Sequence, residues 1–227
     1  MKTKSIFNKS FDVSRDLMTD SEHCLIRNCN HVGEINLFDV KGCMVENCDF
    51  ERSDLWLFNP SDVIFRNITA ANTSLWLNWA RKISFENVTL VNPEISLAGS
   101  DSKDFEIELK NCTVDGKPVY YYRNQSDLML DNLDAGYIWL VNCTRPSIRG
   151  SKALGIFVIN SSNMILEDSV IDRSGIRLAF SRNCIIRNNI MLNATSNGGI
   201  TQYTGCHNNI VDHESATKRE SMMHGLQ

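Results

Sequence analysis

The 227-residue sequence predicts an all-β protein, a single-stranded right-handed parallel β-helix of about ten coils. Three observations predict this fold class. Short apolar segments recur at a period of about 20 residues; a charge alternates in sign at one fixed position of the period; and the corners between segments are rich in asparagine. Coils that stack in register would explain all three, because equivalent residues then lie side by side on neighbouring strands.

The period is defined by a polar anchor residue, usually asparagine, at one corner of each coil. The anchors are Asn28, Asn47, Asn67, Asn87, Asn111, Asn132, Gly150, Asp168, Asn188 and, more loosely, His213. The residue two positions before each anchor is apolar, which is the alternation of a half-buried strand. A second alternating strand follows each anchor, with inward pairs such as Leu55/Leu57 and Leu75/Leu77. We expect the stacked amides to hydrogen-bond from coil to coil, with Gly150 interrupting the ladder.

The residue just before each anchor carries a charge, and its sign alternates along the whole chain. The series is Arg27, Glu46, Arg66, Glu86, Lys110, Asp131, Arg149, Glu167, Arg187 and Asp212. Opposite charges on neighbouring strands are stabilising and like charges are not, so the alternation favours parallel strands in register. Leucine-rich repeats have a similar period, but "LWLFN" misplaces the asparagine of their frame.

The organisation expected is one β-helical domain over residues 23–213, with a lead-in or cap at 1–22 and a polar tail or cap at 214–227. A net charge of -4 without a basic run argues against nucleic acid as a partner. No stretch approaches the roughly 18 apolar residues of a membrane span. The N-terminal "MKTKSIFNKSFDVSRDLM" also lacks the apolar region of a secretory signal peptide.

Two segments resemble the NosD-like, pectin-lyase-like β-helix proteins, in particular archaeal surface proteins. They are "DGKPVYYYRNQSDLMLDNLDAGYIWLVNCT" (115–144) and the later coils that begin "GIFVINSSNMILEDSV". The resemblance implies a right-handed β-helix with carbohydrate-related or export-associated roles. It also implies an extracellular or cell-surface location. Since no signal peptide is present in this chain, we expect a piece of a larger protein, whose other domains would be partners.

The cysteines and histidines raise the question of a metal site. Cys24, Cys29, Cys43 and Cys48 form CxxxxC twice, a spacing that suggests zinc. The repeat instead places them in columns otherwise filled by apolar residues, which predicts stacked core thiols. Copper would suit the resemblance, but its candidate ligands form no close group: His23, His31, His207, His213, His224, Met222 and Met223. We therefore expect no metal and no cofactor.

An outward row of aromatic residues is the strongest functional signal. Because Leu55, Leu57, Leu75 and Leu77 point inward, the tryptophans between them point outward. The predicted ligand-binding residues are Trp56, Trp76, Tyr120, Trp139 and Phe157 in the row, with Asp54, Asn78 and Glu94 beside it. Aromatic rings suit the apolar C–H faces of sugars, and the polar side chains suit hydroxyl groups. The favoured hypothesis is a β-helix domain whose work is binding or display at a cell surface, with polysaccharide as the favoured ligand.

Two other functions fit the same sequence. A polysaccharide lyase or glycoside hydrolase would need acidic or arginine groups converging beside the row, and no catalytic residue is assigned. Asp54 and Glu94 stand two coils apart, roughly 10 Å, which is long for a retaining pair of carboxylates and near the upper limit for an inverting pair. A structural spacer of a larger surface protein would instead have the row covered by another segment. The sequence leans away from an enzyme without deciding the matter.

Overall fold

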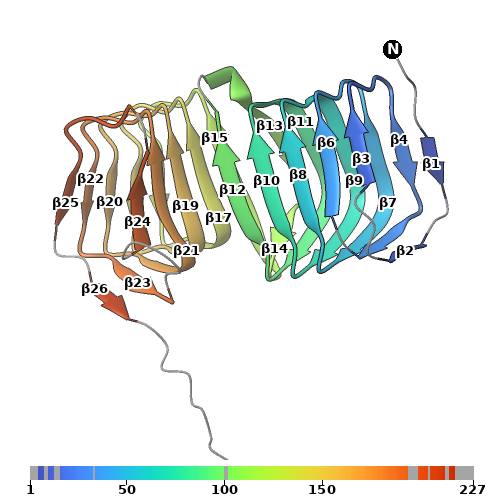
Figure 1. The fold of residues 1–227 in the computed structure, drawn as a ribbon. Helices are drawn as coiled ribbons and strands as arrows, with labels where there is room; N and C mark the ends of the chain where they lie inside the picture. Colours follow the sequence, from blue (N-terminus) through green and yellow to red (C-terminus); the bar gives the residue numbers. More distant parts are fainter. Residues whose placement is uncertain are drawn as a thin grey trace, which may run out of the picture. The chain divides into compact units, whose positions relative to one another are not determined.

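The protein is a parallel β-helix in the computed structural model, which describes residues 5–7, 10–12, 16–32, 34–99, 102–193, 199–203, 205–212 and 215–217. Strands of successive coils pair in parallel and in register (Figure 1). The chain divides into two compact units, unit 1 (Met1–Tyr121) and unit 2 (Tyr122–Gln227). The predicted fold class is confirmed, with about eight turns where ten were predicted.

The irregular level near the end of unit 1 explains part of that difference. There β14 (Thr113–Val114) and β15 (Lys117–Arg123) pair antiparallel as a hairpin, so this stretch does not form a regular coil. Strands also extend past the predicted limits of the helix. Ser5–Phe7 pairs with Leu25–Arg27, inside the predicted lead-in, and Ser215–Thr217 pairs with Ile190–Leu192, inside the predicted tail. The loosest anchor, His213, lies outside the described residues.

In unit 1, one face of the coil is a five-stranded sheet with the order β12-β10-β8-β6-β3. Its strands are β3 (Asp16–Thr19), β6 (Glu34–Phe38), β8 (Asp54–Phe58), β10 (Ser74–Asn78) and β12 (Glu94–Ala98). The other faces are built from β1 (Ser5–Phe7), β2 (Ser10–Asp12), β4 (Leu25–Arg27), β5 (Asn30–Val32), β7 (Met44–Glu51), β9 (Ser61–Ala71), β11 (Ala80–Val91) and β13 (Phe105–Lys110). A short 3-10 helix, η1 (Ser102–Asp104), precedes β13.

In unit 2, one sheet has the order β16-β18-β20-β22-β25. Its strands are β16 (Met129–Asp131), β18 (Ser147–Arg149), β20 (Ile165–Glu167), β22 (Ile185–Arg187) and β25 (Ile210–Asp212). The remaining strands are β17 (Asp134–Val141), β19 (Lys152–Ile159), β21 (Val170–Ala179), β23 (Ile190–Leu192), β24 (Ile200–Gln202) and β26 (Ser215–Thr217). In the described part of the chain, no helix is long and apolar enough to cross a membrane.

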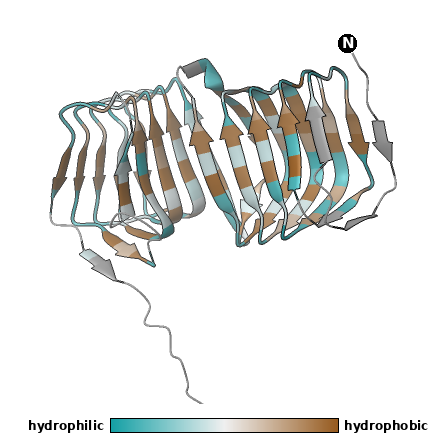
Figure 2. Cartoon of the chain, in the orientation of Figure 1, coloured by the Kyte–Doolittle hydropathy of each residue, from teal (hydrophilic) through white to brown (hydrophobic). Residues whose placement is uncertain are grey.

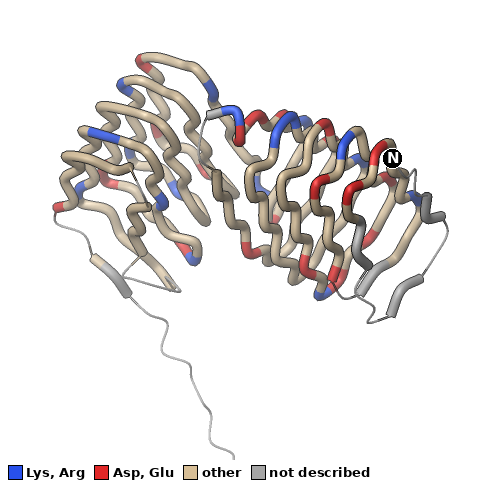
Figure 3. The backbone as a smooth tube through the Cα atoms, turned by 45° about the horizontal axis from the view of Figure 1, so that its top comes forward, with Lys and Arg blue, Asp and Glu red and all other residues tan. Residues whose placement is uncertain are grey.

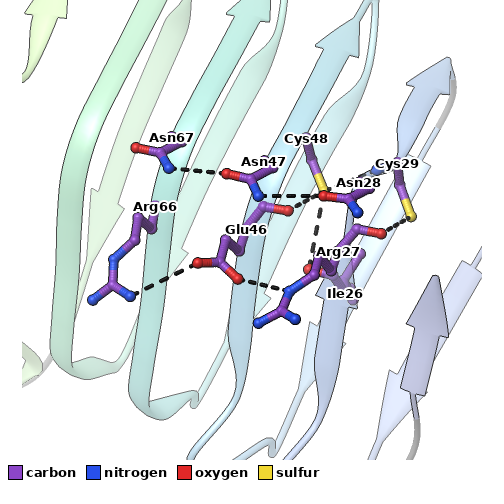
Figure 4. Close-up of polar contacts among 9 residues, drawn as sticks. All are labelled: Ile26, Arg27, Asn28, Cys29, Glu46, Asn47, Cys48, Arg66 and Asn67. Carbon is purple, nitrogen blue, oxygen red and sulfur yellow. Dashed lines mark hydrogen bonds and ion pairs between the residues drawn. The ribbon is translucent and has the colours of Figure 1, made fainter. Parts of the chain in front are cut away.

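The asparagine anchors form the corner at which the long strands of unit 1 bend. Asn47, Asn67 and Asn87 have φ angles of +53°, +53° and +55°, a left-handed conformation that asparagine tolerates better than most residues. The Nδ2 of Asn67 donates to the Oδ1 of Asn47 at 2.9 Å, and Asn87 donates to Asn67 at 3.0 Å. Figure 4 shows the first members of this ladder. The amide ladder predicted from the sequence is therefore confirmed in unit 1.

The alternating charges form ion pairs between coils, as predicted. In unit 1, Arg27 Nε lies 2.7 Å from Glu46 Oε2, and Arg66 Nε lies 2.7 Å from Glu86 Oε2. Arg66 also approaches Glu46 at 3.8 Å, so the pairs form a continuous series (Figure 4). In unit 2, Arg149 and Arg187 contact the two carboxylate oxygens of Glu167. The charged column is thus in register within each unit.

The core contains the inward residues of each strand and the stacked cysteines. Hydrophobic and polar positions alternate along the strands of unit 1 (Figure 2), and Leu57, Leu77 and Ile83 are fully or almost fully buried. All eight cysteines are free, and six of them are buried. The Sγ of Cys43 accepts a hydrogen bond from the backbone N–H of Cys24 at 3.3 Å. The prediction of core thiols is confirmed for these residues.

Candidate binding face on unit 1

One face of unit 1 gathers aromatic side chains that the core does not contain. We call it the aromatic face and define it by residues of β6, β8 and β10 and the corner after β10: Phe38, Trp56, Phe58, Trp76 and Trp79. Leu55 and Leu57 are buried, at 5% and 0% exposure. Alternation along β8 therefore directs Trp56 and Phe58 to the outside.

Trp56 and Trp76 stand directly opposite each other on β8 and β10. Their ring centroids are 4.7 Å apart and the ring planes differ by 1°, a face-to-face stack. Both side chains are half-buried. Because each ring covers one face of the other, solvent meets the ring edges and the outer faces of the pair.

The two ends of the tryptophan stack differ. In register, Trp56 is followed by Asn36 on β6, and Trp76 is followed by Ser96 on β12. Asn36 is only 1% exposed, whereas Ser96 is partly exposed and small. β12 is also the last strand of its sheet in the described structure. The outer face of the Trp76 ring, toward Ser96, is therefore the aromatic surface best placed to receive a flat ligand.

A second aromatic cluster extends the face, and sequence reasoning missed it. Phe58 and Trp79 pack edge to face at 5.0 Å, and Phe38 packs against Phe58 at 6.0 Å. Phe58 is 44% exposed and Trp79 is 36% exposed. The signal for Phe58 was present, since it lies two residues after Trp56 and so shares its side of the strand. Trp79 occupies a corner with φ of +50°, the same left-handed conformation that Asp39 and Asn59 adopt at the equivalent corners of the preceding coils, with φ of +52° and +50°.

Polar side chains border the aromatic residues. Glu34, Asp54, Ser74 and Glu94 align in register on four neighbouring strands. Asp54 and Glu94 are exposed, and Glu34 accepts a hydrogen bond from the Nδ2 of Asn36 at 3.0 Å. Asn78 is half-buried and stands opposite Phe58. The structure thus brings the predicted Asp54, Asn78 and Glu94 onto the same face as Trp56 and Trp76.

The other predicted members of the row do not join this face. Tyr120 lies on β15, which is not a strand of the β12-β10-β8-β6-β3 sheet. Trp139 and Phe157 are stacked at 5.9 Å, but they are only 3% and 2% exposed. The prediction that these two rings form part of an exposed band was wrong.

The reason lies in the composition of β17 and β19, which are apolar on both sides. Val141 and Ile159 on the outer side are as buried as the inward Ile138, a pattern typical of strands covered on both faces. Tyr137 lies across Gly155, where an added Cβ would meet its ring at 2.7 Å, and its Oη is 2.6 Å from Ser174 Oγ. Alternation gave the direction of each side chain but not what covers it.

Among the residues that the structure describes, no group of three or more His, Cys, Asp and Glu side chains could hold a metal ion. Of the ligands considered for copper, His213, His224, Met222 and Met223 lie outside those residues.

The buried thiols of Cys43 and Cys48 have raised pKa values. Burial raises the pKa of the Cys48 thiol to about 11 and that of Cys43 to about 12. A thiol with so high a pKa stays protonated near neutral pH and is a poor nucleophile and metal ligand. These cysteines therefore act as packing residues.

No family model and no curated protein sequence matches the chain. Among solved structures, the A-module of the Azotobacter vinelandii mannuronan C-5 epimerase AlgE6 is similar with 11% identity and a TM-score of 0.36, over 91% of this chain and 75% of that one. The pentapeptide repeat protein HetL from Nostoc sp. strain PCC 7120 is similar with 12% identity and a TM-score of 0.29, over 89% of this chain and 92% of that one. The A-module of the Azotobacter vinelandii mannuronan C-5 epimerase AlgE4 is similar with 11% identity and a TM-score of 0.30, over 91% of this chain and 77% of that one. TM-scores this low carry no inference about ligand or activity.

Proposed function

We propose that this chain is a polysaccharide-binding domain that acts at the cell surface or outside the cell through the aromatic face of unit 1. The observation that carries the proposal is the half-buried Trp56–Trp76 stack beside the exposed Phe58 and Trp79. Three of the four tryptophans of the chain belong to this face. Contiguous exposed aromatic groups of this kind usually mark an interaction site.

The chemistry of the face suits a sugar. The Trp76 ring surface toward Ser96 can stack on the apolar C–H face of a pyranose, a contact that needs a flat aromatic surface. Asp54, Glu94 and Asn78 lie within the same sheet and can accept hydrogen bonds from hydroxyl groups. Stacking and directional hydrogen bonds together are the usual composition of a small-molecule site.

Binding is better supported than hydrolysis or lyase chemistry. A glycosidase places its two carboxylates on opposite sides of the scissile bond. Glu34, Asp54 and Glu94 instead lie in one column of one sheet and project from the same side of it. Carboxylates arranged in this way can contact successive sugars of a polysaccharide, but they do not lie on the two sides of one glycosidic bond.

The test is retention on a polysaccharide array by wild-type protein and by the Trp56→Ala/Trp76→Ala variant. We expect the variant to lose at least about tenfold in affinity, since each lost stacking contact is worth about 0.5–1.5 kcal/mol beyond its buried area. Tyr203→Ala is the matched control, because Tyr203 is 47% exposed and lies in unit 2. It should bind like the wild type.

Two results would overturn the proposal. Unchanged retention by the double variant would place the ligand elsewhere. Aggregation, or a fall in melting temperature far beyond the few degrees expected for half-buried rings, would mean that the tryptophans belong to a protein interface, as in a structural spacer.

A further inference from the structure

The charged groups on the aromatic face are all of one sign. The outward residues are Glu34, Asn36 and Phe38 on β6, Asp54, Trp56 and Phe58 on β8, Ser74, Trp76 and Asn78 on β10, and Glu94, Ser96 and Ala98 on β12. These positions include three carboxylates and no lysine or arginine. Figure 3 shows acidic positions on neighbouring coils of unit 1.

This distribution differs from the rest of the same coils. On the face that carries the charge ladder, Glu46 stands between Arg27 and Arg66, so each acid has a base on the next strand. On the aromatic face, Glu34 stands directly opposite Asp54, and like charges at opposed positions destabilise a sheet. The alternation of acidic and basic residues that stabilises the other face is therefore absent from the column Glu34–Asp54–Ser74–Glu94 beside the aromatic residues.

The acids at this border are also open to a ligand. Asp54 and Glu94 are both exposed, and neither makes an ion pair within the described part of the chain. The nearby Arg52 instead contacts Glu51, at 3.4 Å. The border therefore offers acceptors and negative charge, and it calls for a ligand rich in donors and positive charge.

We propose, on the basis of the polysaccharide-binding function above, that the ligand is a polymer of amino sugars whose amines are free and protonated. An ammonium group has three hydrogen-bond donors for the carboxylates, and it is also attracted to the face of a tryptophan ring. A polyuronate would instead meet three carboxylates of its own sign, and the net charge of -4 on the chain adds to that repulsion.

A glycan is favoured over a basic peptide because carboxylates and an open aromatic surface lie on one sheet. Carboxylates stand on β6, β8 and β12, and the outer face of the Trp76 ring is turned toward Ser96 on β12. A polymer that carries both rings and amines can place one ring on that surface and its amines near the carboxylates. A basic peptide presents charge without a stacking ring at each unit, so it is an outcome that the experiment must separate.

The experiment compares four probes by calorimetric titration at low salt: a glucosamine hexamer, an N-acetylglucosamine hexamer, a galacturonate hexamer and an oligolysine peptide. The two glucosamine probes differ only at the nitrogen, which is a free amine in one and a neutral acetamide in the other. We expect the free amine to bind about tenfold more tightly than the acetylated form, because two exposed charge contacts of about 0.7 kcal/mol each correspond to that factor. The advantage should shrink in roughly 1 M salt, where the Debye length is about 3 Å.

The acids are tested with Asp54→Asn/Glu94→Gln, which keeps the side-chain shapes. We expect this variant to prefer the free amine by less than about threefold while still binding the acetylated hexamer, because exposed charge contacts and aromatic contacts act separately. The matched control is Asp49→Asn/Asp168→Asn, which removes two exposed acids from outside this face. It should keep the wild-type preference.

The outcomes separate the two proposals. Equal binding of both glucosamine probes, tightest binding of galacturonate, or an unchanged preference in Asp54→Asn/Glu94→Gln would overturn the amino-sugar inference and leave the polysaccharide-binding function standing. Binding of oligolysine and of none of the sugars would overturn both.

Discussion

The alternating charges between coils can be tested most sharply at Glu167, which contacts an arginine on each neighbouring strand. Its side chain is 10% exposed, and Arg149 Nε lies 2.7 Å from its Oε1. The Nε of Arg187 donates to its Oε2, also at 2.7 Å. Both arginine side chains are about half exposed, at 47% and 48%. Glu167→Lys would replace two attractions by two repulsions in the same column.

The size of the effect follows from this geometry. Exposed ion pairs contribute about 0.2–1 kcal/mol, and hydrogen bonds to charged groups about 1.5–3 kcal/mol. The contacts of Glu167 lie between these cases, so we assign about 1 kcal/mol to each. Glu167→Gln should then lower the free energy of unfolding by about 2 kcal/mol, and Glu167→Lys by about 3–4 kcal/mol. A loss of that size corresponds to a fall of about 10 °C in melting temperature for a protein of this length.

The assay is chemical denaturation at low and at high salt, with Glu51→Lys as the control. The Glu51 side chain is 60% exposed and contacts only the adjacent Arg52, at 3.4 Å, among the ion pairs of the described residues. Its reversal should change the free energy of unfolding by less than about 0.5 kcal/mol. A Glu167→Lys protein as stable as the wild type, or a loss that stays the same in high salt, would refute the in-register ladder as a source of stability.

Three further predictions concern the corners and the core. Asn67→Ala should lose about 1 kcal/mol more than Asn67→Gly in denaturant unfolding, because φ is +53° there and alanine is strained at that angle; equal losses would contradict this. Gly155→Ala should cost about 1–3 kcal/mol, since its Cβ would lie 2.7 Å from the Tyr137 ring; wild-type stability would show that the ring does not cross this site. Because burial raises the pKa of Cys48 to about 11 from 9.0, the folded state holds its proton longer than the unfolded state. The free energy of unfolding should therefore fall between pH 9 and pH 11 and fall less in Cys48→Ala; identical pH profiles would contradict the pKa assignment.

The repeating parts of the fold were predictable, because the same spacing of apolar, charged and asparagine residues recurs in each coil. The Asn67 corner and the Arg66–Glu86 pair follow from period, alternation and charge sign, which are local properties of the sequence. The hairpin of β14 and β15 was missed for another reason: the apolar alternation continues through it, and the two-residue turn signal Asp115–Gly116, with φ angles of +49° and +75°, was not used.

The candidate site was only partly predictable for a different reason. Alternation gives the side of a strand on which a residue lies, and it placed Trp56, Trp76, Asp54 and Glu94 correctly on the outward side. It carries no information about what covers that side, so the burial of Trp139 was missed. Nor does it describe corner residues such as Trp79, which lies between β10 and β11, outside the alternation of either strand.

The most direct test of the central claim is the accessibility of the tryptophans to acrylamide, with and without saturating glucosamine hexamer. In a Trp139→Phe variant, the three remaining tryptophans all belong to the aromatic face. The account predicts that bound ligand lowers the quenching constant of their fluorescence, because it covers the exposed ring surfaces. Binding of the hexamer with no change in quenching would contradict it, since the ligand would then lie away from Trp56, Trp76 and Trp79.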